Sequence, residues 1–363
     1  MIFAPSRPAM RSPLDAWVSL ATGLHGPEPD ALRRWQALRL LEAARWARER
    51  SPFYARLLKH LPDPIPDDPA WAARLPFVTT HDLREHHEAM LCVSQGEVER
   101  VVTLNTSGTT GKPKRLFFTG EDLDATLDFF RVGMASFTGV GDVVLILLPG
   151  RTEHGAAMLL AKALAEIGVR PVLAPQPCPP EVAARLIAEE GVTCLAALPS
   201  QLRALLEHSP GPPPWSPAPD RALDRALLSG EPVDDGLRQA AAKAGIEIFA
   251  HYGLTETCFG GGVECGAHQG YHLREADLLV EVVEPVSGDP VANGRQGEVV
   301  LSTLNRRGMP LLRYRTGDMG RMLPGPCACG SPLRRLGPVA GRIVTDGGAI
   351  QVLTPEKGTA NTP

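Results

Sequence analysis

The segment Thr106–Lys114 is the stretch of this sequence whose residue types point most specifically to chemistry. It contains hydroxyl side chains, two glycines and two lysines within nine residues. Glycine lets backbone N–H groups approach an anion closely, and hydroxyl and ammonium groups donate hydrogen bonds to phosphate oxygens. The segment is not a Walker A loop, because Thr106 and Pro113 stand where that motif has glycine and serine or threonine. Composition alone therefore leaves phosphate binding and a polar hairpin turn as equal alternatives.

A second group of residues has the chemistry of a metal site. Cys265 and His272 lie near each other in the sequence, and Cys327 and Cys329 follow in one short turn. Three thiolates and an imidazole suit a closed tetrahedral zinc site, which is structural because no coordination position stays open. The Cys-x-Cys spacing is tighter than the usual gap of about two to four residues. His268 could replace His272, and four unrelated side chains are the remaining alternative.

The elements that must position these residues follow an alternating pattern. Helices are expected at residues 29–50, 121–137, 153–168, 180–190, 200–208 and 234–244. Buried strands are expected at residues 143–148, 169–173, 193–197, 226–228 and 246–250. This alternation predicts an α/β fold with doubly wound, mostly parallel sheets covered by helices.

The chain changes character after about residue 277. Three β-rich segments, at residues 278–283, 297–303 and 311–314, are separated by turn residues and predict a small antiparallel subdomain. The proline-rich segment 209–220 is expected to be an irregular loop, and the last ten residues are expected to be frayed.

Composition excludes several classes of protein. The chain has 363 residues, a net charge of −4 and only 5% aromatic residues, which argues against a nucleic-acid-binding protein. No apolar run is long enough to span a bilayer, and the N-terminus has no apolar core of a secretory signal. We therefore expect a cytoplasmic protein whose seven cysteines are thiols or metal ligands.

Further segments give Thr106–Lys114 a family context. Ser229–Pro232, Tyr252–Glu256, Tyr314–Asp318 and Gly341–Arg342 follow it along the chain. In order and spacing they resemble the adenine-pocket loop, the YG.TE segment, the Y.TGD segment and the hinge motif of adenylate-forming enzymes. This superfamily includes acyl-CoA synthetases, adenylation domains and luciferases.

The flanking segments narrow the resemblance to one branch. Ser51–Tyr54, Leu75–Phe77, Asp82–Arg84, Glu264–Cys265 and Met309–Tyr314 resemble the phenylacetate–CoA ligase and coenzyme F390 synthetase branch. The resemblance covers roughly residues 35–342 and implies the large N-terminal domain of an adenylate-forming enzyme.

The resemblance also implies a division of the chain. Residues 1–100 are expected to form the helical N-terminal part of the large domain, and residues 101–276 the α/β nucleotide-binding core. Residues 277–342 are expected to form the β-rich subdomain, and residues 343–363 a short tail without the small C-terminal domain.

The activity that the resemblance implies is ATP-dependent adenylation of a small-molecule carboxylic acid, with release of pyrophosphate. The acyl group then passes to CoA or another thiol. The catalytic residues that it implies are Lys112, Thr255 and Glu256, with Glu256 as a ligand of Mg²⁺. The residues that it implies for binding ATP or AMP are Ser107, Gly108, Thr109, Thr110, Gly111, Gly230, Glu231, Tyr252, Gly253, Asp318 and Arg342.

Each implied role has a structural alternative. Tyr252 is expected to pack on the adenine but could be a core aromatic residue, and Glu256 could cap a helix. Asp318 is expected to accept hydrogen bonds from the ribose hydroxyls but could stabilise a turn. Arg342 is expected near the ribose and the hinge. Some members of the branch carry a zinc site with elements like those around Cys265 and His272.

The sequence departs from the family pattern in three places. It ends shortly after Arg342, before the small domain whose lysine contacts the reacting carboxylate, so a separate C-terminal-domain or acceptor protein is an expected partner. Val344 and Thr345 stand where relatives have the hinge aspartates. Arg151–Met158 replaces the stretch that shapes the acyl pocket, which argues against phenylacetate as the acid. A non-catalytic ATP-, AMP- or acyl-adenylate-binding module and a truncated gene product remain as alternatives.

Overall fold

The computed structural model describes residues 12, 14–26, 28–104, 112–208, 222–346 and 349–353. The chain forms two compact units, each assembled from separate segments. The first unit consists of Met1–Pro27, Phe118–Arg274 and Pro326–Leu333, and the second of Glu28–Phe117, Glu275–Gly325 and Arg334–Pro363. Most of the predicted phosphate loop, the loop at 209–220 and the last ten residues lie outside the described residues.

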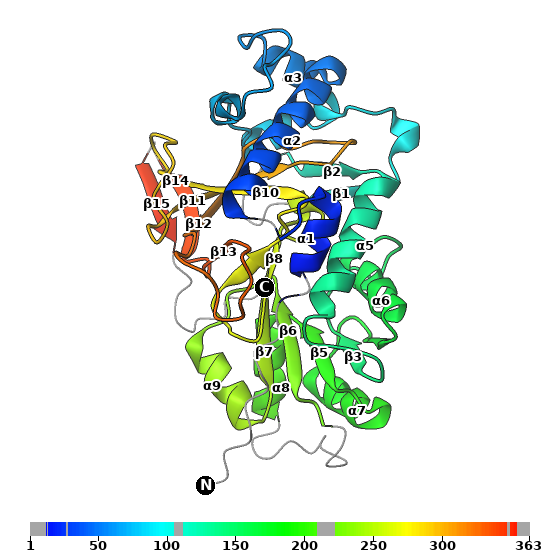
Figure 1. Ribbon diagram of the computed structural model, residues 1–363. Coiled ribbons are helices and arrows are strands. Elements are labelled where there is room, and N and C mark those ends of the chain that lie inside the picture. Colours follow the sequence, from blue (N-terminus) through cyan, green and yellow to red (C-terminus); the bar gives the residue numbers. More distant parts are fainter. Residues whose placement is uncertain are drawn as a thin grey trace. The chain divides into compact units, whose positions relative to one another are not determined.

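The first unit is built on a largely parallel sheet (Figure 1). Its strands run in the order β9-β8-β7-β6-β5-β3-β4. The parallel strands are β3 (Val143–Ile146), β4 (Arg170–Leu173), β5 (Cys194–Ala197), β6 (Arg225–Ser229) and β7 (Glu247–Tyr252). Beside β7, the antiparallel strands are β8 (Gly262–Glu264) and β9 (Tyr271–Leu273).

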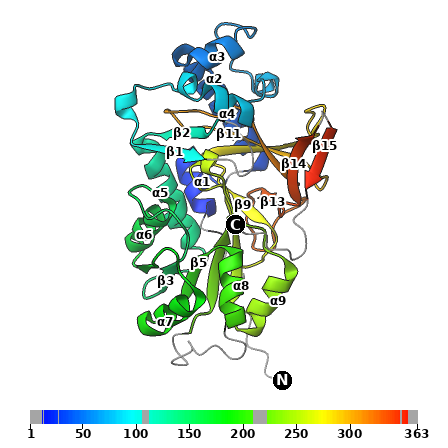
Figure 2. The same ribbon diagram turned by 180° about the vertical axis from the view of Figure 1, so that it is seen from behind.

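The first unit also contains helices. They are α1 (Leu14–Thr22), α5 (Gly120–Met134), α6 (Ala156–Glu166), α7 (Pro180–Glu190), α8 (Pro199–His208), α9 (Asp235–Lys243) and the short η4 (Thr255–Thr257). α5 packs against α6, whereas α8 packs against both α7 and α9. The chain first runs from β3 outward to β4 at the edge of the sheet and then returns through β5 and β6 to β7. Because such crossovers are right-handed, α6 lies on one face of the sheet, and α7, α8 and α9 lie on the other. Seen from behind, α8 lies in front of the sheet (Figure 2).

Local sequence signals explain where these helices begin and end. Thr119 and Asp122 form a reciprocal capping box at the start of α5, and Asp234 caps α9 through the backbone N–H of Leu237. Gly191 ends α7 in a left-handed conformation. Apolar side chains between the sheet and α7 to α9 form a continuous buried core. The predicted doubly wound fold is confirmed, and its helix boundaries shift by only a few residues.

The second unit combines helices with an antiparallel sheet. Its helices are α2 (Pro29–Arg50), α3 (Pro52–Leu57) and α4 (Thr80–His86), with short 3-10 turns η1 (Pro69–Arg74), η2 (Glu88–Met90) and η3 (Gln95–Glu97). β1 (Arg100–Leu104) and β2 (Lys114–Phe118) pair in a two-stranded sheet. The antiparallel sheet has the order β10 (Leu278–Val283), β11 (Gly297–Thr303), β12 (Tyr314–Gly320), β14 (Gly341–Asp346) and β15 (Ala349–Leu353). In β13 (Arg335–Leu336), Leu336 bridges to Met322.

The expected strand at residues 311–314 is displaced: β12 begins only at Tyr314. The reason is Arg313, whose φ of 46° is left-handed and interrupts an extended chain. Its guanidinium accounts for this conformation, because it bonds Glu281 and the backbone oxygens of Ala73 and Leu75.

The hairpin of β14 and β15 was not predicted, since residues after 342 were expected to form a short tail. Its signal is the run Ile343–Thr345, whose β-branched residues favour a strand. None of the helices in the described part of the chain combines the length and apolar character of a membrane span.

Candidate functional site

Two of the predicted motifs follow neighbouring parallel strands of the first unit. β6 ends at Ser229 and β7 ends at Tyr252, and Ser229 is paired with His251 in the register. Because the two strands are parallel, their carboxyl ends lie at the same edge of the sheet. This edge is where open α/β sheets bind their ligands. The structure therefore brings Ser229–Pro232 and Tyr252–Glu256 to one ligand-binding edge.

The Ser229–Pro232 loop is held by a glycine and a carboxylate. Gly230 has a φ of 88°, and a side chain there would meet Leu198 at 3.0 Å. The Glu231 carboxylate accepts hydrogen bonds from the backbone N–H and the hydroxyl of Ser200, both at 2.8 Å. Ser200 lies in the first turn of α8, so Glu231 fixes the loop against the start of that helix. This geometry gives Glu231 a positioning role.

The Tyr252–Glu256 segment turns sharply at the end of β7. The Tyr252 ring is buried and stacks on Tyr271 with ring centroids 6.1 Å apart. Gly253 is required here, because a Cβ would lie 2.3 Å from the carbonyl oxygen of Phe259. Glu256 follows in η4 and is only 5% exposed. The structure supports the core-aromatic interpretation of Tyr252, while its contact with adenine stays a prediction.

In the second unit, the predicted ribose and hinge residues meet across two strands. Asp318 on β12 and Arg342 on β14 are register partners, and Arg342 Nε lies 2.9 Å from Asp318 Oδ1. Asp318 is 4% exposed, whereas the Arg342 side chain is 65% exposed. The Asp318 backbone N–H donates to Thr316 Oγ1 at 2.9 Å, which holds the turn before it. The predicted pair is therefore brought together with its carboxylate buried and its guanidinium open to solvent.

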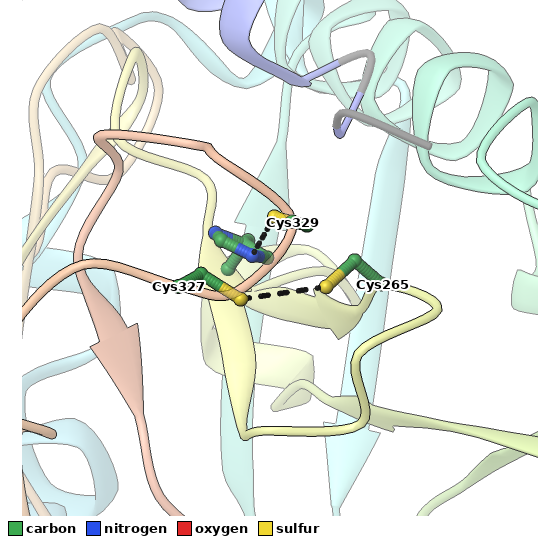
Figure 3. Close-up of side chains that lie close together, drawn as sticks. Cys265, Cys327 and Cys329 are labelled. Carbon is green, nitrogen blue, oxygen red and sulfur yellow. Dashed lines mark hydrogen bonds between the residues drawn. The ribbon is translucent and has the colours of Figure 1, made fainter. Parts of the chain in front are cut away.

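The four predicted metal ligands converge in the first unit. Figure 3 labels the three cysteines among them. Cys265 follows β8, His272 lies in β9, and Cys327 and Cys329 belong to Pro326–Leu333. All four residues are buried, and their ligand atoms lie within 4.8 Å of one another. The Sγ atoms of Cys265 and Cys327 are 3.7 Å apart, and Cys329 Sγ is 3.4 Å from His272 Nε2.

These distances fit one tetrahedral ion. Zn–S bonds of about 2.3 Å and Zn–N bonds of about 2.0 Å place two sulfurs about 3.8 Å apart, and a sulfur and a nitrogen about 3.5 Å apart. Burial, with the neighbouring thiols adding to it, raises the pKa of Cys265 to about 12. A buried cluster of thiols with such a raised pKa becomes anionic only when a cation compensates its charge. His268 is engaged elsewhere, because its Nε2 lies 2.8 Å from Glu247 Oε1, so His272 is the better fourth ligand.

Comparison with known proteins decides the family. A family model described as AMP-binding enzyme matches residues 74–305. A phenylacetate-coenzyme A ligase of Thermus thermophilus is 32% identical over 337 residues, which cover 86% of this chain and 71% of that protein. The chain belongs to the AMP-binding enzymes. Within them it lies in the phenylacetate–CoA ligase branch, as the sequence motifs indicated.

Other relatives agree with this AMP-binding enzyme in sequence and in fold. A phenylacetate-coenzyme A ligase of Escherichia coli is 28% identical, over 86% of this chain and 71% of that protein. A crystal structure of 2-hydroxyisobutyryl-CoA ligase, in complex with 2-HIB-AMP and CoA, matches with a TM-score of 0.73 at 19% identity. That match covers 90% of this chain and 79% of the other, and it shows a shared fold.

The residues predicted to bind phosphate in this AMP-binding enzyme are only partly described. Ser107, Gly108, Thr109, Thr110 and Gly111 lie outside the described residues. Lys112 is described, and its Nζ forms a 2.6 Å ion pair with Glu85 on α4. The hydrogen bond from Lys112 lowers the pKa of Glu85. The contact of Lys112 with phosphate stays a prediction. It requires Lys112 to leave the solvent-exposed Glu85 and to bind the nucleotide instead.

The sequence interpretation missed one polar residue of this AMP-binding enzyme. His251 lies directly before Tyr252 on β7, and its Nδ1 is 2.8 Å from the hydroxyl of Ser229. Burial lowers the pKa of His251 to about 4, so the ring is neutral near pH 7. The signal was present in the sequence, because His251 is the one imidazole in the otherwise apolar run Ile248–Tyr252.

Proposed function

We propose that this AMP-binding enzyme activates a small-molecule carboxylic acid with ATP and transfers the acyl group to CoA. The first step forms acyl-AMP and releases pyrophosphate. The observation that carries the proposal is that two motifs of the family follow the adjacent strands β6 and β7 at one ligand-binding edge. The relatives named above carry ligase names, and they give no support to a non-catalytic binding module.

The chain's own residues would supply binding and charge compensation. Attack of the carboxylate on the α-phosphorus accumulates negative charge on phosphoryl oxygens, which positioned donors stabilise. We assign donation to the β- and γ-phosphates to Ser107, Thr109, Thr110 and Lys112, and donation to the α-phosphate to Thr255. Gly230, Glu231, Tyr252 and Gly253 would form the wall of the adenine site.

Glu256 is suited to bind a magnesium ion. Mg²⁺ prefers carboxylate oxygens and, when bound, neutralises phosphate charge. The Glu256 carboxylate is almost completely buried immediately after the ligand-binding edge of β7, so it would meet the cation with little competition from bulk water.

We also propose that Cys265, His272, Cys327 and Cys329 hold a structural zinc ion. The support is the agreement of their interatomic distances with tetrahedral geometry. With four protein ligands the ion has no open position, so its function would be to fasten Pro326–Leu333 to the β8–β9 hairpin. A cytoplasmic location and a separate C-terminal-domain or acceptor protein stay predictions.

The test of the proposed function is ATP–pyrophosphate exchange across a panel of aliphatic and aromatic carboxylic acids. We expect exchange above the no-acid background with at least one acid and Mg²⁺, and formation of an acyl thioester when CoA is added. A panel that gives no exchange, together with no detectable binding of ATP or AMP by calorimetry, would contradict the proposal.

Replacing Asp318 with alanine is expected to raise the KM for ATP by about 10- to 100-fold, because two hydrogen bonds from ribose hydroxyls to a carboxylate would be lost. The KM for the acid should change little. Asp289→Ala, which removes an exposed aspartate elsewhere in the second unit, is the matched control and should keep the wild-type KM for ATP. Equal KM values for ATP in the wild type and D318A would assign Asp318 to the turn alone.

A further inference from the structure

One buried polar atom at the ligand-binding edge is left without a partner. His251 Nε2 is shielded from solvent and forms no hydrogen bond with any described residue. The other ring nitrogen, Nδ1, is occupied by the Ser229 hydroxyl at 2.8 Å. A buried nitrogen that lacks a hydrogen bond destabilises a protein, so such an atom in a native fold calls for a partner.

The imidazole ring is held in place on several sides. Ser229 lies beside it on β6. The ring of Phe129 packs at 6.2 Å between centroids, and Phe129 itself is buried. Gly253 lies so close that a Cβ there would be 2.7 Å from His251 Cε1. The direction of Nε2 is therefore set by the fold, which gives it the fixed geometry that a recognition group requires.

The surroundings favour a neutral ligand group over a charged one. Burial is the cause that lowers the pKa of His251 to about 4, and no neighbouring charge contributes. A neutral imidazole with Nδ1 paired to a hydroxyl presents Nε2 either as an N–H donor or as an acceptor. A hydroxyl group can satisfy both states and a carbonyl oxygen satisfies the first. A carboxylate in this apolar surrounding would instead hold the ring protonated.

We propose that His251 Nε2 hydrogen-bonds a hydroxyl or carbonyl group on the body of the acid, so that the enzyme selects acids carrying such a group. The inference rests on the proposed function, because it places the acid at the carboxyl ends of β6 and β7, beside Tyr252–Glu256. His251 is then a specificity-determining residue that contacts the substrate and takes no part in proton transfer. Apolar acids of the same shape leave the imidazole nitrogen unpaired and bind more weakly.

Stable mimics of the acyl-adenylate test this without requiring turnover. The probes are pairs of 5′-O-(N-acylsulfamoyl)adenosines whose acyl groups, aliphatic or aromatic, differ only by a hydroxyl or keto group replaced with hydrogen or methylene. Calorimetry with the full chain gives a dissociation constant for each member of a pair. We expect the polar member of at least one pair to bind about 10- to 100-fold more tightly.

Variants assign the preference to the imidazole. H251L is expected to reduce the ratio within that pair to about threefold or less; its affinity for AMP, measured in parallel, reports on the nucleotide site, because the substitution also removes the hydrogen bond to Ser229. H251Q places an amide at a similar reach and should retain part of the preference, which also provides a folded variant if H251L does not fold. His208→Leu, an exposed histidine at the end of α8, is the control and should keep the wild-type ratio.

The outcomes separate the two proposals. If the mimics bind but every pair has a ratio near one, or if H251L and H251Q both keep the wild-type ratio, the role of His251 is wrong and an ordered water molecule is its partner. If neither AMP nor any mimic binds, the proposed function fails and this inference fails with it.

Discussion

Glu256→Gln is expected to lower the rate of ATP–pyrophosphate exchange by about 10²- to 10³-fold, the size of effect seen when one group that stabilises developing charge is removed. The substitution keeps the size of the side chain and removes its negative charge. Because Glu256 is almost completely buried, bulk water cannot easily take over its position as a ligand. The measurement is the exchange rate at saturating acid, with Mg²⁺ varied.

The magnesium dependence distinguishes a ligand from a structural residue. Loss of a ligand should raise the Mg²⁺ concentration for half-maximal exchange, while the melting temperature stays near the wild-type value. Glu166→Gln, an exposed carboxylate at the end of α6, is the matched control and should leave the rate unchanged. An E256Q enzyme within about threefold of wild type would remove Glu256 from the catalytic site and favour the helix-capping alternative.

The second large effect concerns the metal ligands. Cys329→Ser and Cys265→Ser are each expected to yield protein without bound zinc and to lower the free energy of unfolding by about 3 kcal/mol or more. A site filled at a hundred times its Kd already contributes about 2.7 kcal/mol. In a chain of this size the corresponding decrease in Tm is roughly 4 °C. Elemental analysis and thermal unfolding on the same samples provide the two measurements.

A control separates metal loss from the general cost of altering a cysteine. Cys178 is a free thiol that is only partly buried and lies outside the cluster, so Cys178→Ser should keep both the zinc content and the Tm. Adding a strong chelator to wild type should reproduce the lower Tm of C329S. Wild-type protein with no zinc, and no response to either substitution or chelator, would show that the cluster is a group of packed thiols.

The sequence was sufficient for the α/β fold class and for most helices because those signals were local. The alternation of helical and strand patterns, the capping box at Thr119 and Asp122, and Gly191 at the end of α7 all act within a few residues. The conformation of Arg313 was not predictable in this way. It depends on Glu281 and on the carbonyls of Ala73 and Leu75, which are distant in sequence.

In the candidate site, too, the features that depend on local sequence were predictable, and those that depend on distant residues were not. The motif order along the chain indicated which residues belong to it, and the parallel register of β6 and β7 explains why two of the motifs meet. The anchoring of Glu231 by Ser200 and the isolation of His251 Nε2 required the fold, because both depend on neighbours from other elements. The metal cluster lay between these cases: its residue types were visible in the sequence, and its distances were not.

The path of the chain through the metal cluster has a topological consequence. Cys265 and Cys327 are 62 positions apart, and the intervening residues leave the first unit and build β10, β11 and β12 of the second. An ion bound to both would close this stretch into a ring. A ring of that length restricts the unfolded chain by about 4 kcal/mol in the loop-entropy treatment of cross-links. A single protease cut inside it would leave two fragments that remain joined until the ion is removed.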